Sequence, residues 1–240
     1  MPFLDPDGVP LAGLGLRYLR ELEFTVEQPF RWVDPRDGAE YDVPAGERTD
    51  LASVPPFLWG LVASYGRQTL PSILHDALAR RAANAPPASR YAERRDADLR
   101  FRRALVESGV TVLRARTMWT VVALDRELRF RTPLGVLLAV QALLSIAAIV
   151  GGVVVAAALG DPRWLLLLPA PAVVAILWWR DAGLVLCCAY LGALYLPLIA
   201  TAALASALEY LIALIVWLAQ GRPGPTPHPG PTLGAPGGGA

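Results

Sequence analysis

One long apolar stretch limits what this chain can fold into more than any other feature. Nearly every residue between Pro133 and Ala219 is apolar, and the charged residues there are Asp161, Arg163, Arg180, Asp181 and Glu209. A helix of about 20 apolar residues crosses a bilayer core of about 30 Å. The stretch is therefore long enough for about three or four crossings. Because residues 1–132 hold nearly all the remaining charged residues, we predict a soluble head followed by a membrane domain.

The predicted organisation of the 240 residues follows this contrast. Residues 1–131 form the soluble head, residues 132–220 form a transmembrane helical domain, and residues 221–240 form a disordered tail rich in Pro and Gly. We predict an α+β fold, in which the head contains a β-hairpin and about three helices and the membrane domain is an all-α bundle. The mean hydropathy of +0.41 agrees with a large membrane part.

The membrane domain begins with a predicted span at Pro133–Leu159, and a second span, Trp164–Trp179, contains two prolines. The remaining stretch, Ala182–Ala219, would be about 57 Å long as one helix, which exceeds one straight crossing. Pro197 favours two short helices there, and the alternative is one long helix that leaves the bilayer. Glu209 would then lie near the middle of the membrane, where an acidic residue is a candidate for function.

The distribution of charged residues predicts on which side of the membrane the head lies and which partners it has. The first residues lack the basic start and the apolar core of a signal peptide. Five arginines precede the first span: Arg114, Arg116, Arg126, Arg129 and Arg131. By the positive-inside rule we expect an integral membrane protein with a cytoplasmic head. Expected partners are membrane lipid and either another protein or a second copy bound through the membrane helices. A net charge of +1 predicts no nucleic-acid partner.

Strand and helix signals divide the head into a β part and an α part. Residues Leu22–Val33 and Glu40–Val43 have strand character, and the turn-forming run Asp34–Gly38 between them predicts the hairpin. The helical segments are expected to follow the hairpin, with Ser89 as a cap and Gly109 as a stop signal. They are Leu70–Ala83, Ser89–Ser108 and Leu113–Arg129.

Two positions on the first two helices are suited to chemistry. His75 and Asp98 lie about a dozen residues on either side of Pro86-Pro87, so an antiparallel helix pair would bring them together. A carboxylate on one imidazole nitrogen fixes the tautomer and makes the other nitrogen a better base. Asp76 points to a different face and is suited to bind a hard cation. The alternative is a buried histidine that Asp98 satisfies for structural reasons only.

A resemblance to a known family rests on several of these motifs together. The motifs are Pro44–Trp59 with its Thr-Asp-Leu-Ala-Ser-Val-Pro-Pro run, Gly66, Ile73-Leu-His-Asp-Ala-Leu78, Asp96-Ala-Asp-Leu-Arg-Phe101 and Gly109-Val110. The stretch of about residues 22–125 resembles DUF1353, a phage-associated family of unknown function. The resemblance singles out Thr49, Asp50, Ser53, Pro55, His75, Asp76 and Asp98. The chain departs from the family pattern at Ala79, where the family tends to carry Tyr.

The helix pair is also similar, over a shorter motif, to the core of prokaryotic phospholipases A2. That resemblance implies His75 as the base that activates water, Asp76 as a Ca²⁺ ligand and Asp98 as the residue that orients His75. The loop from Ala45 to Ser53 would offer carbonyl ligands. The disulfides of those enzymes are absent, and the head has no Tyr at position 79.

Two hypotheses of different classes follow. In the first, the protein is a membrane-tethered hydrolase with His75 and Asp98 as catalytic residues, acting on lipid or another membrane-proximal substrate. Thr49, Asp50 and Ser53 then bind a cofactor, with Asp76 and Asp50 as ligands of a metal, Ca²⁺ by the resemblance. In the second, the head is a non-catalytic, phage-derived interaction or structural module. Both predict that the loop Thr49–Ser53 lies against the His75 helix.

Overall fold

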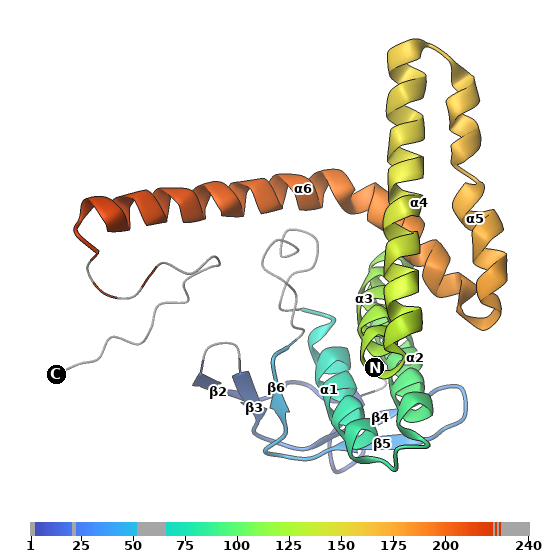
Figure 1. The fold of residues 1–240 in the computed structure, drawn as a ribbon. Helices are drawn as coiled ribbons and strands as arrows, with labels where there is room; N and C mark the ends of the chain where they lie inside the picture. Colours follow the sequence, from blue (N-terminus) through green and yellow to red (C-terminus); the bar gives the residue numbers. More distant parts are fainter. Residues whose placement is uncertain (1–2, 21–22, 52–65, 223, 225, 227–240) are drawn as a thin grey trace. The chain divides into compact units, whose positions relative to one another are not determined.

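The computed structural model describes residues 3–20, 23–51, 66–222, 224 and 226. The chain has an α+β fold and divides into two compact units. Residues 1–52 and 65–194 form the first unit, and residues 53–64 and 195–240 form the second. The first unit contains the head together with the first apolar helices (Figure 1). The predicted site residue Ser53, Pro55 and the tail 227–240 lie outside the described residues.

Six short strands form two antiparallel sheets in the described part of the head. Their bounds are β1 Phe3–Leu4, β2 Leu16–Arg20, β3 Glu23–Val26, β4 Phe30–Val33, β5 Glu40–Val43 and β6 Arg48–Thr49. One sheet has the order β1-β4-β5 and the other has the order β2-β3-β6. Each sheet contacts helix α1, one through β5 and the other through β6 (Figure 1).

The predicted hairpin is confirmed as β4 and β5, but its first strand is shorter than expected. The predicted strand segment Leu22–Val33 is divided into β3 and β4, which belong to different sheets. Phe30 pairs with Val43 and Val33 pairs with Glu40, so the turn falls on Asp34–Gly38 as expected. Gly38 adopts a positive φ of 70°, which glycine allows without the strain of a Cβ atom. Phe30 and Trp32 alternate with partly buried neighbours along β4 and enter the core.

The second sheet, β2-β3-β6, did not follow from the sequence. Strand β2 was not predicted, because its residues Leu16–Arg20 carry two arginines and show weak alternation. Strand β6 is only Arg48–Thr49, and it pairs with Phe24 and Thr25 of β3 across more than twenty intervening residues. This pairing matters for the site, because it places Thr49 beside helix α1.

Three helices complete the head at nearly the predicted bounds: α1 Thr69–Asn84, α2 Arg90–Glu107 and α3 Val112–Phe130. Gly109, with φ of 79°, ends α2 as predicted, and the Val110 amide bonds back to the Leu105 carbonyl. Ser89 is the N-cap residue of α2, as predicted, but its side chain makes no capping hydrogen bond. Its hydroxyl donates to the Pro86 carbonyl instead, because the preceding turn offers that acceptor within reach.

Helices α1 and α2 pack on the strands through one apolar core. The largest buried side chains in this core are Trp32, Phe3, Phe30, Leu51, Ile73 and Leu74. Leu70 and Tyr41 lie at its margin. Burying this surface orients α1 so that His75 faces α2 while Asp76 faces β6.

The apolar part of the chain is helical throughout the described residues. Its elements are α4 Thr132–Leu159, the 3-10 segment η2 Pro162–Leu167, α5 Ala170–Ala175, the 3-10 segment η3 Ile176–Asp181, and α6 Ala182–Ala219. Two stretches, Thr132–Leu159 and Pro162–Ala219, are long and apolar enough to cross a membrane. The first predicted span is therefore confirmed as a helix, and the second is divided into three short pieces around its prolines.

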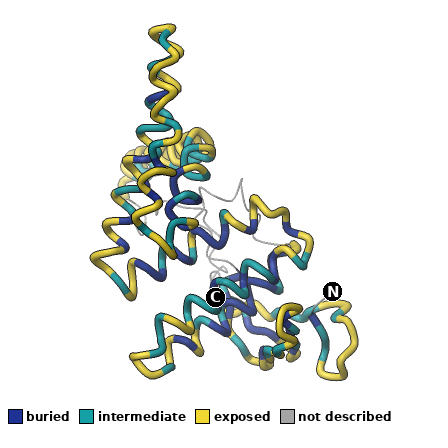
Figure 2. Tube along the Cα trace, turned by 90° about the vertical axis from the view of Figure 1, so that its right-hand side faces the viewer, coloured by how far each residue is buried: buried dark blue, intermediate teal, exposed yellow. Residues whose placement is uncertain are grey.

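The expected break near Pro197 is wrong. Helix α6 is 38 residues long and passes through Pro197 without a break, so the structure shows the alternative of one long helix. Proline removes one backbone donor, yet the surrounding Leu and Ala residues favour helix and supply no competing turn. A count of about three or four crossings stays a prediction. Many residues of α4 and α6 are exposed, and Glu209 is among them. Exposed residues are coloured yellow along the trace in Figure 2.

Candidate functional site

The centre of the candidate site is a buried pair formed by His75 and Asp98. His75 lies in the middle of α1 and Asp98 in the middle of α2, and the short turn at residues 85–89 makes these helices antiparallel neighbours. The Nε2 atom of His75 is 2.9 Å from Oδ1 of Asp98. His75 is 6% exposed and Asp98 is 0% exposed. The structure therefore brings together the two residues that were predicted to meet.

The hydrogen bond determines which nitrogen of His75 is available. An ionised carboxylate only accepts hydrogen bonds, so Nε2 carries the proton and donates to Asp98. In the neutral ring, Nδ1 is then the unprotonated nitrogen. The ring lies against Phe101, with 4.7 Å between the ring centroids, so its orientation is held by packing as well as by the hydrogen bond.

Arginines bind the rest of the Asp98 carboxylate. Nη1 of Arg126, in α3, donates to Oδ2 of Asp98 over 2.6 Å, and Nε of Arg94 lies 3.3 Å from Oδ1. Arg126 is 2% exposed, so this ion pair lies away from water. Burial by itself lowers the pKa of the Arg126 guanidinium, but Asp98 and Glu127 outweigh burial and the pKa is raised. Asp98 therefore joins all three head helices.

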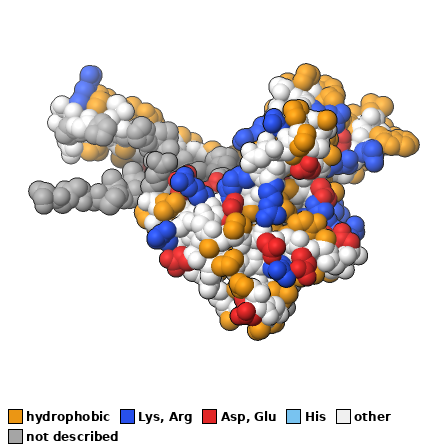
Figure 3. All heavy atoms as spheres, turned by 90° about the horizontal axis from the view of Figure 1, so that it is seen from below, with side chains coloured by type: hydrophobic (Ala, Val, Ile, Leu, Met, Phe, Trp, Pro, Cys, Tyr) orange, Lys and Arg blue, Asp and Glu red, His pale blue; other side chains and the backbone are white. Residues whose placement is uncertain are grey.

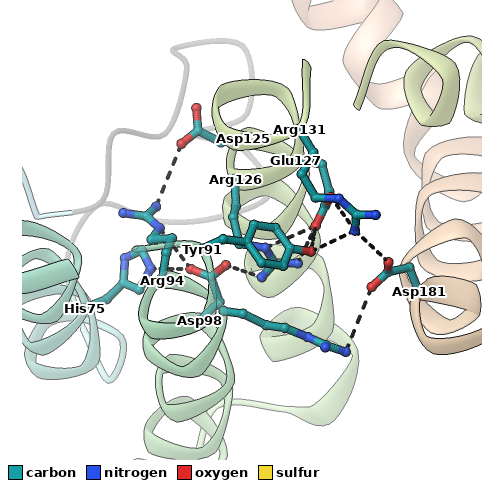
Figure 4. Close-up of polar contacts among 10 residues, drawn as sticks. His75, Tyr91, Arg94, Asp98, Asp125, Arg126, Glu127, Arg131 and Asp181 are labelled. Atoms are coloured by element: carbon teal, nitrogen blue, oxygen red, sulfur yellow. Dashed lines mark hydrogen bonds and ion pairs between the residues drawn. The ribbon is translucent and has the colours of Figure 1, made fainter. Parts of the chain in front are cut away.

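The same network continues from Arg126 toward the apolar helices (Figure 4). Glu127, also buried, accepts hydrogen bonds from Arg126 over 3.0 Å and from the Tyr91 hydroxyl over 2.6 Å. Arg131 donates to the Tyr91 hydroxyl over 3.2 Å, and its Nη1 lies 3.5 Å from Oδ2 of Asp181 at the end of η3. Burial and the bond to Glu127 raise the pKa of the Tyr91 phenol. A continuous chain of polar contacts thus links His75 to the start of α6.

Asp76 takes part in a second, separate arrangement. The Thr49 hydroxyl donates to Oδ2 of Asp76 over 2.6 Å, and the Leu51 amide donates to the Thr49 oxygen over 3.0 Å. Leu51 has a positive φ of 61°, a strained conformation for a branched side chain, so the chain turns sharply after Thr49. Burial, followed by the charge of Asp50, raises the pKa of Asp76 to about 6, although the Thr49 hydrogen bond opposes the shift.

The predicted site residues therefore fall into two groups, His75 with Asp98 and Thr49 with Asp76. Asp50 lies close enough to Asp76 for its charge to affect the pKa of Asp76. The expectation that the Thr49 loop lies against the His75 helix is confirmed as far as Leu51, and Ser53 lies beyond the described residues. Among the described residues no three His, Cys, Asp or Glu side chains gather as metal ligands, so Ca²⁺ binding stays a prediction.

The sequence reasoning missed Arg126, Glu127 and Asp181. A signal for Arg126 was present, because it stands seven residues after Trp119 and three after Ala123, on the helical face that buries both. A charged residue on such a face needs a buried partner, and Asp98 was available. Asp181 stood out in the sequence only as one of the few charged residues of the apolar stretch.

Comparison with known proteins finds a family match for one part of the chain. The profile of a family described as a protein of unknown function (DUF1353) matches residues 24–122. This match covers strands β3–β6 and helices α1 and α2 with most of α3, and it leaves the apolar helices outside. The head is therefore similar to that family over the region that carries His75, Asp76 and Asp98. No curated protein and no solved structure matches the chain.

Proposed function

We propose that the protein is a membrane-tethered hydrolase in which Nδ1 of His75 acts as the general base. The observation that carries the proposal is the 2.9 Å hydrogen bond between Nε2 of His75 and Asp98. It directs the proton of the neutral ring to Nε2 and leaves Nδ1 as the nitrogen that can accept a proton from water. Asp98 positions the His75 ring, and Arg126 and Arg94 in turn hold the Asp98 carboxylate in place.

Asp76 supplies the second half of the proposed chemistry. It follows His75 in the chain but faces Thr49, so the two side chains serve different parts of one site. A pKa of about 6 means that the partly buried carboxylate of Asp76 gains from a nearby positive charge. A hard cation held by Asp76 and Asp50, with the Thr49–Ser53 loop around it, would supply that charge and polarise an ester carbonyl.

The proposed substrate is lipid or another ester presented at a membrane. The two apolar stretches keep the head at a bilayer if they cross it, so substrate in the membrane would be reached without release of the enzyme. The arginines that precede α4 favour a cytoplasmic position for the head by the positive-inside rule. A protein partner or a second copy could be bound through α4 and α6, whose side chains are largely exposed.

The test measures fatty acid released from phospholipid vesicles that contain the full chain, with and without millimolar Ca²⁺. The variants His75→Gln and Asp76→Asn are expected to lower the rate by at least about a hundredfold. His228→Gln is the matched control, since it makes the same change in the only other histidine and should leave the rate unchanged. Wild-type release that His75→Gln does not reduce would contradict the proposal.

A second candidate is a non-catalytic membrane-anchored module, and one observation favours it. Arg126 and Arg94 both contact Asp98, so this buried carboxylate binds side chains of α1, α2 and α3 at once, as a structural centre would. In that case His75 and Asp98 serve to join α1, α2 and α3. The chain has only two histidines, so their imidazole NMR signals can be assigned by removing His228. A His75 ring that does not titrate and stays closed to water between pH 5 and 9 would support this second candidate.

A further inference from the structure

A second polar feature of the head lies away from His75, where Arg102 of α2 meets Trp119 of α3. The Arg102 guanidinium carbon is 5.1 Å from the centroid of the Trp119 ring, and Arg102 is half-buried. Its neighbours Arg100 and Arg103 form ion pairs with Asp96 and Asp34. Within the described residues, by contrast, the Arg102 and Arg116 side chains take part in no ion pair.

Trp119 connects this feature to the apolar helices. It belongs to the buried cluster that contains Leu138 of α4 and Leu184 and Cys187 near the start of α6. Cys187 is also close enough to Arg102 to affect its pKa. Arg102 is therefore positioned at the junction where the head meets the first residues of α4 and α6, which is where lipid headgroups would lie if these helices cross a bilayer.

The electrostatics of the junction favour an anion. Burial lowers the pKa of the Arg102 guanidinium, and the positive charges of Arg116 and then Arg36 lower it further. Like charges that lack a counter-ion destabilise one another, and an anion between them would remove that cost. Over the face drawn in Figure 3, blue Arg side chains and red acidic side chains are interspersed rather than gathered into one basic surface.

Trp119 adds an unused donor at the same place. It is 8% exposed, and its Nε1 is buried with no hydrogen-bond partner in the described part of the chain. Leaving a buried N–H group without a partner is unfavourable, so such groups are usually satisfied in the functioning molecule. A phosphate offers several strong acceptor oxygens, and arginine is the side chain that binds phosphate with two parallel hydrogen bonds.

We propose that Arg102, Arg116 and Trp119 bind the phosphate of an anionic phospholipid at the junction of α2, α3 and the start of α6. A lipid fits better than a free phosphate ion, because its acyl chains would cover the exposed apolar side chains of α4 beside the headgroup. Arg102 and Trp119 form the inner part of the site and the exposed Arg116 forms its outer edge. The proposal does not depend on hydrolysis, so it stands or fails separately from His75.

The test uses the full chain in detergent with its seven tryptophans labelled at the indole nitrogen. The Trp119 signal is assigned from Trp119→Phe and followed by NMR during titration with dihexanoyl phosphatidylglycerol. Dihexanoyl phosphatidylcholine and inorganic phosphate are titrated in parallel. We expect the Trp119 signal to shift with phosphatidylglycerol at much lower concentration than with either comparison ligand.

Variants then separate the site from general attraction between charges. R102Q and R116Q should each weaken phosphatidylglycerol binding about tenfold, as expected for one charge-assisted hydrogen bond. R114Q is the control, because Arg114 stands two residues before Arg116 and so faces another side of α3. If R102Q disturbs folding, the exposed R116Q still tests the site. Equal weakening by R114Q and R116Q, a Trp119 signal that does not move, or equally tight binding of inorganic phosphate would overturn the proposal.

Discussion

Helices α1–α3 bury charged side chains, whereas α4 and the start of α6 bury almost only small or apolar ones. In the head, Asp98, Arg126 and Glu127 are all at most 2% exposed and bind one another. In α4 the buried residues are Gly135, Leu138, Ala142, Ser145 and Gly152. On its exposed face, α4 carries large apolar side chains such as Leu143 and Leu144.

The difference shows what each region depends on. The head depends on complete pairing inside, because a buried charge that loses its partner is far costlier than a lost surface contact. The apolar helices depend on their surroundings, because their exposed Leu and Val side chains need an apolar phase or a partner to cover them. Changes at matched positions in the two regions should therefore have very different effects.

The largest effect is expected from Arg126→Met. This change leaves Asp98 and Glu127 as buried carboxylates without their shared partner, so the free energy of unfolding of the head should fall by about 3–5 kcal/mol. Arg129→Met in the same helix is the control. The Arg129 side chain is 73% exposed and pairs with Asp125 at the surface, so the loss there should be below about 1 kcal/mol. Urea unfolding followed by hydrogen exchange of α2 and α3 measures both, and similar losses would contradict the buried network.

A leucine-to-alanine pair comes next. Leu74 is 0% exposed in the head core, so Leu74→Ala should lower the free energy of unfolding by about 2–5 kcal/mol through lost burial and a cavity. Leu144 of α4 is 67% exposed, and Leu144→Ala should change stability by less than about 1 kcal/mol. Thermal unfolding in detergent gives both values. A large loss at Leu144 would mean that this face of α4 is covered by another part of the protein or by a second copy.

The third prediction concerns pH and Asp76. Its folded pKa of about 6 lies above the ordinary aspartate value of 3.8, so the fold favours the protonated carboxyl. Stability should therefore be highest below pH 4 as far as this group is concerned, and should fall as the pH rises from about 4 to 6 and beyond. Because Asp76 retains some exposure, we expect a loss on the order of 1–2 kcal/mol. Asp76→Asn should remove this part of the pH dependence in denaturation curves measured at several pH values.

The smallest effect is expected at the outer end of the network. Asp181 contacts Arg131 at 3.5 Å and Arg95 at 3.9 Å, and both arginines are partly exposed. Asp181→Asn should therefore lower stability by less than about 1 kcal/mol and raise hydrogen exchange only near the junction of α3 and α4. A loss comparable with that of Arg126→Met would show that the start of α6 is a structural part of the head.

The sequence predicted the parts of the fold that depend on nearby residues. The hairpin at Asp34–Gly38, the helices α1, α2 and α3, and the start and end of α4 all carry local signals, such as turn residues, periodic apolar positions and a glycine stop. The contact of His75 with Asp98 also followed, because two helices joined by a short turn must run side by side. Those predictions needed only the spacing of residues along the chain.

Only the tertiary structure decided the second sheet, the partners of Asp98 and the course of α6. Strand β6 has two residues and exists because β3 offers it an edge. Arg126 meets Asp98 because α3 packs on α2. Asp181, at the end of η3, joins the same network through its contact with Arg131. Pro197 was a local signal that pointed the wrong way. For the second sheet and the partners of Asp98, the free energy comes from contacts between residues distant in sequence, which no local pattern records.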